Sequence, residues 1–303
     1  MGKETVIDAP AKINLSLDVI GKRENGYHDV RMIMQQISLH DTITITVEEN
    51  GNKGSCADGA SGLITVGTNS GELPVNEDNL VYKAAKLIMD ECRISKPVRI
   101  FIDKHIPIAA GLAGGSSDAA AVLKGMNSLF DLKLKDERLK DIGVRIGADV
   151  PYCITGGTAL AEGIGEVLTP LPSIPDCFIL IAKPGISVST GYVYTAFDSL
   201  EDKIHPDVDG MISTINEGNL QGMAALLCNS LEGVTQEEYP VIKEIKRLML
   251  DNGAMGALMS GSGPTVFGLY RDKESALAGA DAVKKSGKAQ DIEVTEPLNK
   301  GNC

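Results

Sequence analysis

The feature of this sequence that most constrains its fold is a glycine-rich segment at residues 108–118, between a predicted strand and a predicted helix. Residues 98–102 alternate as a half-buried strand does, and the alanine-rich residues from about 118 to 130 have helical spacing. The first-turn amides of that helix, at Ser116 and Ser117, converge at the positive end of its dipole. The segment therefore predicts a phosphate-binding loop. The segment matches neither the common P-loop motif nor Gly-x-Gly-x-x-Gly. The alternative to a phosphate-binding loop is a tight strand-to-helix connection packed with small residues.

Two further residues suit phosphoryl chemistry. The strand predicted at residues 11–19 places Lys12 and Asn14 on its polar face, and Asp149 follows a predicted helix in the run Gly-Ala-Asp-Val-Pro. When phosphate is transferred to an alcohol, a carboxylate accepts the hydroxyl proton while a cation offsets negative charge. Taken singly, Lys12 is better explained as an ordinary exposed strand lysine. Asp149 alone is equally compatible with a turn aspartate at the end of a helix.

The chain mixes strands and helices without a regular β-α-β order, which predicts an α+β fold. Strands are expected at residues 11–19, 30–37, 41–49, 98–102 and 178–182. Further helices are expected at residues 79–92, 136–146, 192–200, 220–230, 238–251 and about 273–285. Residues 50–76, rich in Gly, Ser and Asn, are expected to be irregular. Glycine-rich residues 156–165 and proline-rich residues 169–176 mark the candidate domain boundary.

The charge balance restricts the partners that such a chain can bind. There are 29 basic and 41 acidic residues, a formal net charge of −12, whereas nucleic acid is bound through a net basic surface. The cysteines and the four histidines lack metal-ligand spacing. The longest aliphatic run, residues 178–182, is far shorter than the roughly 18 residues of a membrane span. We therefore expect a cytoplasmic protein that binds neither nucleic acid nor membranes, and the oligomeric state is not predicted.

Two short motifs are weak singly and informative in order. Gly26-Tyr27-His28 lies in a polar loop, and Gly261-Ser262-Gly263 lies between two predicted strands. Five motifs follow one another along the chain in the order seen in one family. They are Pro-Ala-Lys-Ile-Asn-Leu at residues 10–15, Gly-Tyr-His at 26–28, the glycine-rich loop, the Gly-Ala-Asp-Val-Pro run and Gly-Ser-Gly at 261–263. Over about residues 7–294 the chain resembles the GHMP kinase superfamily. The glycine-serine loop alone would identify only the superfamily, whereas the other motifs resemble one group within it.

The resemblance implies a role for each matching position. Lys12 and Asp149 match the two catalytic positions, with Asp149 as the base that deprotonates the acceptor hydroxyl. The implied ATP-binding residues are Pro107, Ala109, Ala110, Gly111, Leu112, Gly114, Gly115, Ser116 and Ser117. The implied substrate-binding residues are Asn14 at the polyol, and Tyr27, His28 and Tyr194 at a cytosine. ATP is implied as co-substrate and Mg²⁺ is expected with it, without identified protein ligands.

The resemblance also implies a two-domain GHMP kinase fold. Residues 1–160 would form an α+β domain similar to the second domain of a small-subunit ribosomal protein, and residues 161–303 a ferredoxin-like domain. The implied reaction is ATP-dependent phosphorylation of the 2-hydroxyl of 4-diphosphocytidyl-2-C-methyl-D-erythritol, a cytidine diphosphate-linked methylerythritol, in non-mevalonate isoprenoid biosynthesis. The alternatives are a superfamily kinase acting on homoserine, mevalonate or a sugar, a nucleotide-binding module without catalysis, and a structural or interaction protein.

The chain departs from some relatives within the loop. Ala109, Ala110 and Ala113 stand where some relatives have glycine, and alanine has less access to positive φ angles. Because both implied substrates are polyanions and the chain is acidic, binding must rest on local donors. Lys104 and Lys183 are candidates for such donors besides Lys12 and the helix amides.

Overall fold

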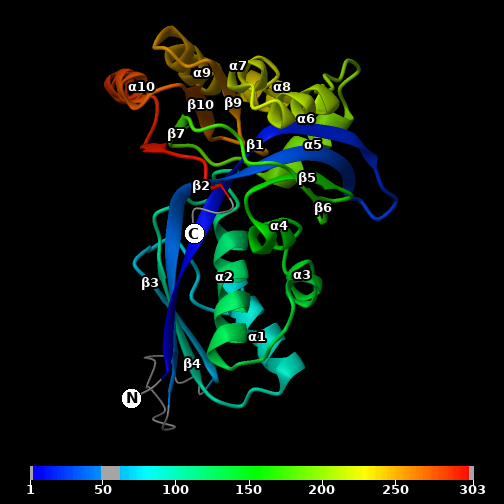
Figure 1. The fold of residues 1–303 in the computed structure, drawn as a ribbon, viewed down its shortest axis with the longest axis vertical. Coiled ribbons are helices and arrows are strands. Elements are labelled where there is room, and N and C mark those ends of the chain that lie inside the picture. The colour runs from blue at the N-terminus through cyan, green and yellow to red at the C-terminus, as the bar shows by residue number, and fades with distance from the viewer. Residues whose placement is uncertain (1–2, 49–61, 300–303) are drawn as a thin grey trace. The chain divides into compact units, whose positions relative to one another are not determined.

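A computed structural model describes residues 3–48 and 62–299 (Figure 1). The described residues form two compact units, each assembled from separate stretches of chain. Unit 1 contains the residues up to Pro10 together with His40–Ile106 and Ala113–Thr155. Unit 2 contains Ala11–Leu39, Pro107–Leu112 and the residues from Gly156 onward. The division into domains of residues 1–160 and 161–303 stays a prediction.

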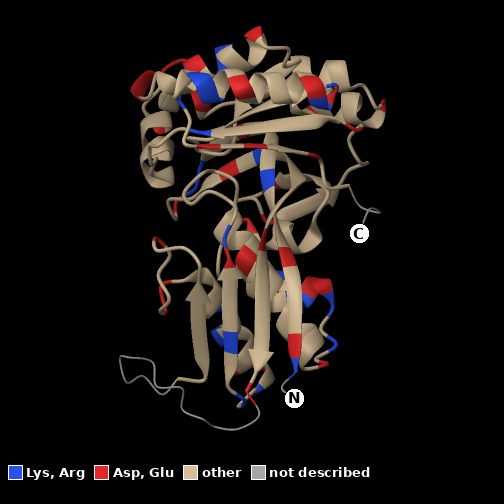
Figure 2. Ribbon diagram, turned by 90° about the vertical axis from the view of Figure 1, so that its left-hand side faces the viewer, with Lys and Arg blue, Asp and Glu red and all other residues tan. Residues whose placement is uncertain are grey.

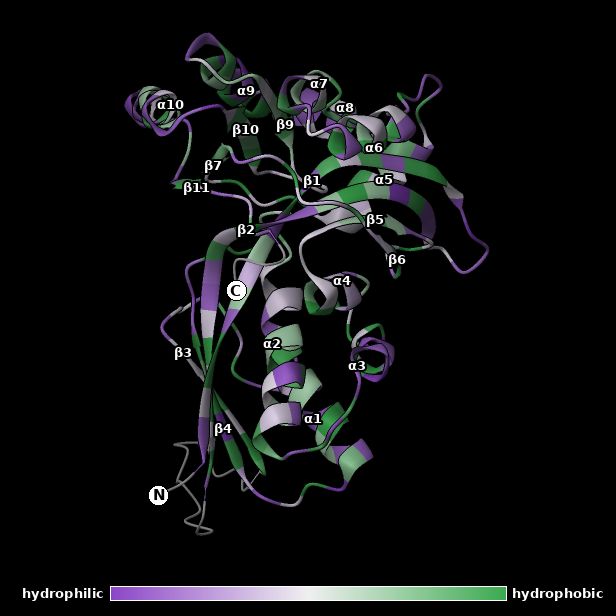
Figure 3. Cartoon of the chain, in the orientation of Figure 1, coloured by the Kyte–Doolittle hydropathy of each residue, from purple (hydrophilic) through white to green (hydrophobic). Residues whose placement is uncertain are grey.

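Two long strands, β1 (Glu4–Lys22) and β2 (His28–Val47), run from one unit into the other. In unit 1, β2 pairs antiparallel with β4 (Val98–Asp103), so that Ile43 lies opposite Ile102. The strand β3 (Ile64–Thr68) extends this sheet, parallel to β4. Apolar and polar residues alternate along these strands (Figure 3), which places one side chain in two in the core.

The helices of unit 1 lie along one face of this sheet (Figure 1). The helix α1 (Leu80–Cys92) begins at Asn79, whose side chain accepts a 2.9 Å hydrogen bond from the Val81 amide. It packs against α2 (Gly114–Leu129), the helix that follows the glycine-rich loop. The shorter helices α3 (Asp136–Gly143) and α4 (Val150–Thr155) pack against each other and against α2.

Unit 2 contains a four-stranded antiparallel sheet in the order β11-β7-β10-β9. Its strands are β7 (Phe178–Lys183), β9 (Gly256–Met259), β10 (Val266–Tyr270) and β11 (Asp291–Thr295). Two helices, α9 (Val241–Asp251) and α10 (Lys273–Ser286), pack on the sheet. The succession β7-α9-β9-β10-α10-β11 is the β-α-β-β-α-β pattern of ferredoxin-like domains. The predicted ferredoxin-like fold is therefore confirmed in this part of the chain.

The remainder of unit 2 is built around the parts of β1 and β2 that belong to it. There β2 pairs with β5 (Thr158–Glu162), β5 pairs with β6 (Val167–Pro170), and β1 pairs with the short β8 (Cys228–Asn229). Four helices lie between β7 and α9 in the chain: α5 (Thr190–Asp198), α6 (Val208–Asn216), α7 (Leu220–Ala225) and α8 (Glu232–Glu238). No helix in the described stretches is long and apolar enough to cross a membrane.

Several sequence-based boundaries are wrong. The two strands expected at residues 30–37 and 41–49 are one strand, β2. Residues 156–165, where the domain boundary is expected, also contain a strand that was not expected, β5, which pairs on both edges and has positive-φ glycines around it. The strand β3 lies within the expected irregular stretch, whose residues 50–61 fall outside the described residues. The helix expected at 220–230 ends at Ala225, and α6 and α8 were not expected.

Candidate functional site

The first turn of α2 presents backbone amides at the expected position. Ala113 is the N-cap residue and provides no side-chain cap, so helix geometry leaves the N–H groups of Gly114, Gly115 and Ser116 without intrahelical acceptors. The Ser117 amide donates to the Ala113 carbonyl at 2.9 Å, and the Ser117 hydroxyl donates to the Pro10 carbonyl at 2.7 Å. The donors that this turn leaves for an external acceptor are therefore the amides of residues 114–116.

Gly115 is the residue at which a test separates ligand binding from folding. It is exposed, and a Cβ built on it would meet only Leu80, at an ordinary contact distance of 3.4 Å. We expect Gly115→Val to fold normally and to raise the KM for ATP roughly tenfold or more, about 1.4 kcal/mol of binding, because the side chain blocks backbone approach to phosphate. Steady-state kinetics with varied ATP measures this.

The matched control is Gly233→Val. Gly233 is also the second residue of its helix, α8, and a Cβ built on it would meet no atom within 4 Å. This variant should keep the wild-type KM for ATP. An unchanged KM in Gly115→Val would show that the turn does not hold the phosphates.

The earlier half of the loop, Pro107–Leu112, belongs to unit 2 and is fixed by its backbone. Gly111 has φ +74°, and a Cβ on it would collide with the Ser260 carbonyl oxygen. The Ser260 hydroxyl in turn donates to the Gly111 carbonyl at 3.0 Å, and the Lys12 amide donates to the Leu112 carbonyl at 3.1 Å. Ala110 and Leu112 are buried, and the Leu112 carbonyl is occupied by the Lys12 amide, so these two residues shape the loop from within the fold.

Two alanines of the loop adopt the conformation that glycine favours. Ala109 has φ 51° and Ala113 has φ 55°, both in the left-handed region, whereas Ala110 does not have a positive φ. The left-handed region costs a non-glycine residue roughly 1–2 kcal/mol. The loop therefore keeps its backbone course at these two positions despite the substitution of alanine for glycine, and it stores local strain.

Lys12 is not an exposed strand lysine. Its side chain is buried, and its Nζ donates a 2.7 Å hydrogen bond to Oδ1 of Asn14, two residues along β1. Asn14 is fully buried, and its Nδ2 lies 3.3 Å from the Met32 sulfur. The alternation of β1 thus aligns an ammonium and an amide within the interior of unit 2. A buried lysine that is held in this way suits the stabilisation of charge on a bound group.

Asp149 lies in the turn that leads into α4. Its carbonyl accepts the Cys153 amide at 3.0 Å, so it stands at the N-cap position of this helix. The turn also lies beside the start of α2, since a Cβ built on Gly147 would be 3.7 Å from the Ser116 hydroxyl oxygen. Within unit 1, the sequence run that carries the predicted base and the amides of the predicted phosphate site are therefore neighbours.

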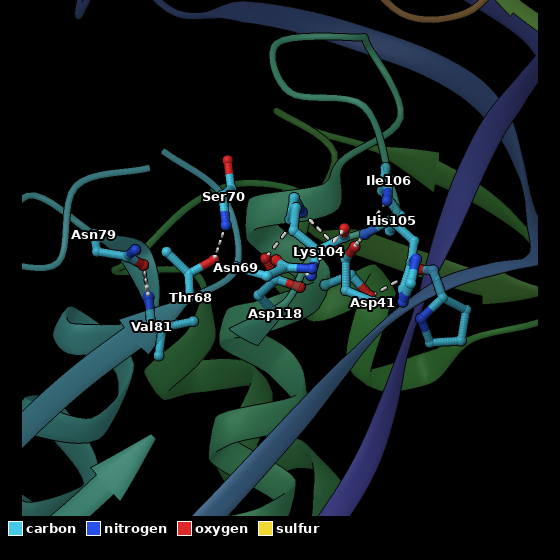
Figure 4. Close-up of polar contacts among 12 residues, drawn as sticks. Asp41, Thr68, Asn69, Ser70, Asn79, Val81, Lys104, His105, Ile106 and Asp118 are labelled. Atoms are coloured by element: carbon cyan, nitrogen blue, oxygen red, sulfur yellow. Dashed lines mark hydrogen bonds and ion pairs between the residues drawn. The ribbon is translucent and has the colours of Figure 1, made fainter. Parts of the chain in front are cut away.

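A buried charge cluster supports the same helix end (Figure 4). Lys104 forms ion pairs with Asp41 and, at 3.1 Å, with Asp118, and the three side chains are 6%, 0% and 3% exposed. Asp41 Oδ1 also accepts the amides of His105 and Ile106, at 2.6 and 2.8 Å. Burial raises the pKa of Asp118 well above its usual range, although Lys104 opposes this. The ammonium of Lys104 is thus neutralised within the fold, which weakens its candidacy as a phosphate donor.

Tyr27, His28 and Tyr194 all belong to unit 2. The rings of His28 and Tyr194 lie 4.8 Å apart between centroids, tilted by 37°, whereas Tyr27 is 57% exposed. His28 Nε2 lies 2.7 Å from Oδ1 of Asp198, and Lys22 Nζ lies 2.7 Å from Oδ2 of the same carboxylate. Asp198 and Lys22 were not among the residues expected from the sequence. The only signal was the spacing of Tyr194 and Asp198, which are four apart on one helix and so share a face.

Two family models match the chain. The GHMP kinases N terminal domain matches residues 79–157, and the GHMP kinases C terminal domain matches residues 211–289. A curated relative from Lachnospira eligens is 50% identical over 292 residues, covering 96% of this chain and 97% of its own. One from Lachnoclostridium phytofermentans is 53% identical over 270 residues, covering 89% of each. The chain belongs to the GHMP kinase family, and it is a kinase whose co-substrate is ATP.

The names of these matches are more specific. Both relatives are named 4-diphosphocytidyl-2-C-methyl-D-erythritol kinase. A crystal structure of 4-(cytidine 5'-diphospho)-2C-methyl-D-erythritol kinase is similar, with a TM-score of 0.79 and 31% identity over 97% of this chain and 99% of that one. A homoserine kinase from Cytophaga hutchinsonii has a TM-score of 0.76 at 21% identity over 99% of this chain and 96% of that one, a likeness of fold alone.

Proposed function

We propose that this protein transfers the γ-phosphoryl group of ATP to the 2-hydroxyl of 4-diphosphocytidyl-2-C-methyl-D-erythritol, a step of non-mevalonate isoprenoid biosynthesis. The observation that carries the proposal is the 50% identity over 96% of the chain to a relative of that name. The arrangement of His28, Tyr194 and Asp198 supports it, since homoserine, mevalonate and simple sugars offer no base for these groups to hold.

In the proposed mechanism, the chain's residues act mainly by alignment and charge stabilisation. Asp149 accepts the proton of the acceptor hydroxyl. The hydroxyl oxygen then attacks the γ-phosphorus of ATP, as the bond between the γ-phosphorus and the bridging oxygen of the β-phosphate breaks. Lys12, held by Asn14, stabilises the negative charge on the attacking oxygen. The amides at the start of α2 hold the phosphates of ATP.

We propose that Mg²⁺ enters with ATP. Within residues 3–48 and 62–299, no group of three or more His, Cys, Asp or Glu side chains is placed to hold a metal ion. Mg²⁺ in kinases is commonly held by phosphate oxygens, water and only one or two carboxylates. Such a donor set does not require three protein side chains around one ion. When bound, the ion would neutralise charge on the transferred phosphoryl group.

We also propose that the reaction takes place in the cytoplasm. Cys92, Cys177 and Cys228 carry free thiols. Free thiols persist in reducing compartments, where disulfides are rare.

The experiment that tests the proposed function compares acceptor alcohols directly. The protein is incubated with MgATP and, separately, with 4-diphosphocytidyl-2-C-methyl-D-erythritol, homoserine, mevalonate and galactose, while ADP release is followed. We expect turnover with the cytidine compound and at most trace activity with the others. Turnover with another alcohol would assign a different kinase activity, and ADP release with none would identify a nucleotide-binding module without catalysis.

The charge distribution leads to a prediction about salt. Acidic and basic residues are interspersed along the helices (Figure 2), and the net charge is −12 while both substrates are polyanions. Long-range attraction therefore contributes little to substrate encounter. We expect kcat/KM to stay flat or to rise between about 50 and 300 mM salt, since screening weakens only long-range repulsion. Initial rates at constant pH measure this, and a steep fall would reveal electrostatic steering.

A further inference from the structure

One carboxylate, that of Asp198, holds both ends of the loop that carries Tyr27. Its Oδ2 pairs with Lys22, the last residue of β1, and its Oδ1 with His28, the first residue of β2, each at 2.7 Å. Residues 23–27 lie between these two contacts. Asp198 is the last residue of α5, one turn after Tyr194, so it also ties this helix to the loop.

The chemistry of this contact determines where His28 carries a hydrogen. Lys22 and His28 lower the pKa of Asp198, so its carboxyl group is ionised at neutral pH. An ionised carboxylate only accepts hydrogen bonds. The Nε2 atom of His28 must therefore carry a hydrogen, and in the neutral ring Nδ1 is then an acceptor. The His28 side chain is 8% exposed, and Tyr194 packs against its ring, so the ring has little freedom to turn.

The Nδ1 atom of His28, held as a hydrogen-bond acceptor, distinguishes cytosine from uracil. Cytosine presents a donor, its exocyclic amino group, where uracil presents a carbonyl oxygen. A histidine free to move its hydrogen to Nδ1 could bond the exocyclic group of either base, whereas one whose hydrogen is held at Nε2 can accept from the cytosine amino group and leaves the uracil carbonyl oxygen at that position unpaired. A site that leaves a buried polar group unpaired with the wrong ligand can discriminate strongly.

We propose that Asp198 is a positioning residue that selects cytosine over uracil by holding the hydrogen of His28 at Nε2 and fixing its ring against Tyr194. The inference rests on the proposed function and adds to it a determinant of base specificity. Asp198 acts through His28 and does not touch the substrate.

The test compares the cytidine substrate with its uridine counterpart, in which uracil replaces cytosine. For Asp198→Asn we expect the ratio of kcat/KM for the cytidine over the uridine compound to fall roughly tenfold or more, because the amide can also donate to Nε2. The change should arise mainly in the KM for the nucleotide-linked alcohol. The KM for ATP should stay within about twofold and kcat within about threefold, which also shows that the variant is folded.

Two control variants isolate the effect. Asp209→Asn breaks an exposed ion pair between α6 and Arg31 of β2, with contacts of 2.6 and 3.1 Å, and should leave the base ratio unchanged. Lys22→Met removes the other partner of Asp198 and retains the Asp198 carboxylate that accepts the hydrogen bond from His28. The ratio of kcat/KM for the cytidine over the uridine compound should therefore be largely kept.

The possible outcomes separate the two proposals. If wild type uses the cytidine compound and Asp198→Asn keeps the wild-type base ratio, the proposed function stands and the role of Asp198 is overturned. An equal loss of the ratio in Asp209→Asn would overturn it as well, by showing a general disturbance of the unit. If wild type does not use the cytidine compound, the proposed function fails, and the inference about Asp198 fails with it.

Discussion

Asp149→Asn should lower kcat about 10²- to 10⁴-fold, the usual contribution of a positioned general base, while the KM for ATP changes little. The amide matches the carboxylate in size and cannot accept the hydroxyl proton. The helix that follows should persist, because its first hydrogen bond, from the Cys153 amide, goes to the backbone carbonyl of residue 149. The loss should therefore appear in the chemical step and leave nucleotide binding intact. Coupled ADP release, together with calorimetric titration of an ATP analogue, measures both quantities.

Asp141→Asn is the matched control for this variant. Asp141 is an exposed carboxylate on α3, in the same unit, and lies 3.8 Å from Arg138 in a surface ion pair. Its replacement should leave kcat and both KM values at wild-type levels. Near-wild-type turnover in Asp149→Asn would remove this residue from proton transfer and would require another base.

Local patterns in the sequence predicted the elements that local forces determine. Period-two alternation predicted β4, which has one buried face, and much of β1, although residues 11–19 of β1 are buried on both faces. Helical spacing predicted α1 and α10 closely, and Asn79 and Asp272 cap these helices as their side chains allow. The same reasoning failed at β5, whose strand conformation comes from pairing with β2 and β6 and not from its own short, alanine-rich sequence.

Charged groups that meet from distant parts of the chain could not be predicted. Asp198 lies 170 residues from His28 and 176 from Lys22, so no local spacing relates them. Lys12 has the polar-face position of a surface lysine, and only the packing around β1 makes it buried. The glycine-rich loop was recognisable from its composition. That Ser117 directs both its amide and its hydroxyl into the fold became visible only in three dimensions.

The cluster of Lys104, Asp41 and Asp118 connects the end of β4 with the start of α2 within unit 1. Lys104 lies close to the start of α2, since a Cβ built on Gly114 would be 2.8 Å from its Nζ. The Lys104 amide also donates to Asn69 at 2.8 Å, which holds the end of β4 (Figure 4). The cluster thus joins the strand that leads into the loop to the helix that leaves it. Its integrity should determine both the stability of unit 1 and the position of the amides at residues 114–116.

Lys104→Met should therefore destabilise the protein by roughly 3–5 kcal/mol, because it leaves two buried carboxyl groups without their cation. The folded-state pKa of Asp118 is already raised by burial, and loss of Lys104 raises it further. For an acid with a raised pKa, stability is fully present below the unfolded-state value, about 4, and is lost as pH rises toward the folded-state value. Because folded wild type and variant both keep this proton below the wild-type pKa of Asp118, about 8, the destabilisation caused by the substitution should be larger at pH 9 than at pH 7. Urea unfolding followed by circular dichroism at both pH values measures it.

Two comparisons give this prediction its specificity. Lys86→Met breaks an exposed ion pair with Asp90 on α1, at 2.8 Å, and should produce no measurable change, since solvent screens such pairs. Lys104→Met combined with Asp118→Asn should recover part of the lost stability and most of its pH dependence, because the amide can donate to Asp41 and does not ionise. If Lys104→Met were as stable as Lys86→Met at pH 9, the buried cluster would not hold the helix end. The position of the amides at residues 114–116 would then depend on the loop's own glycines and alanines alone.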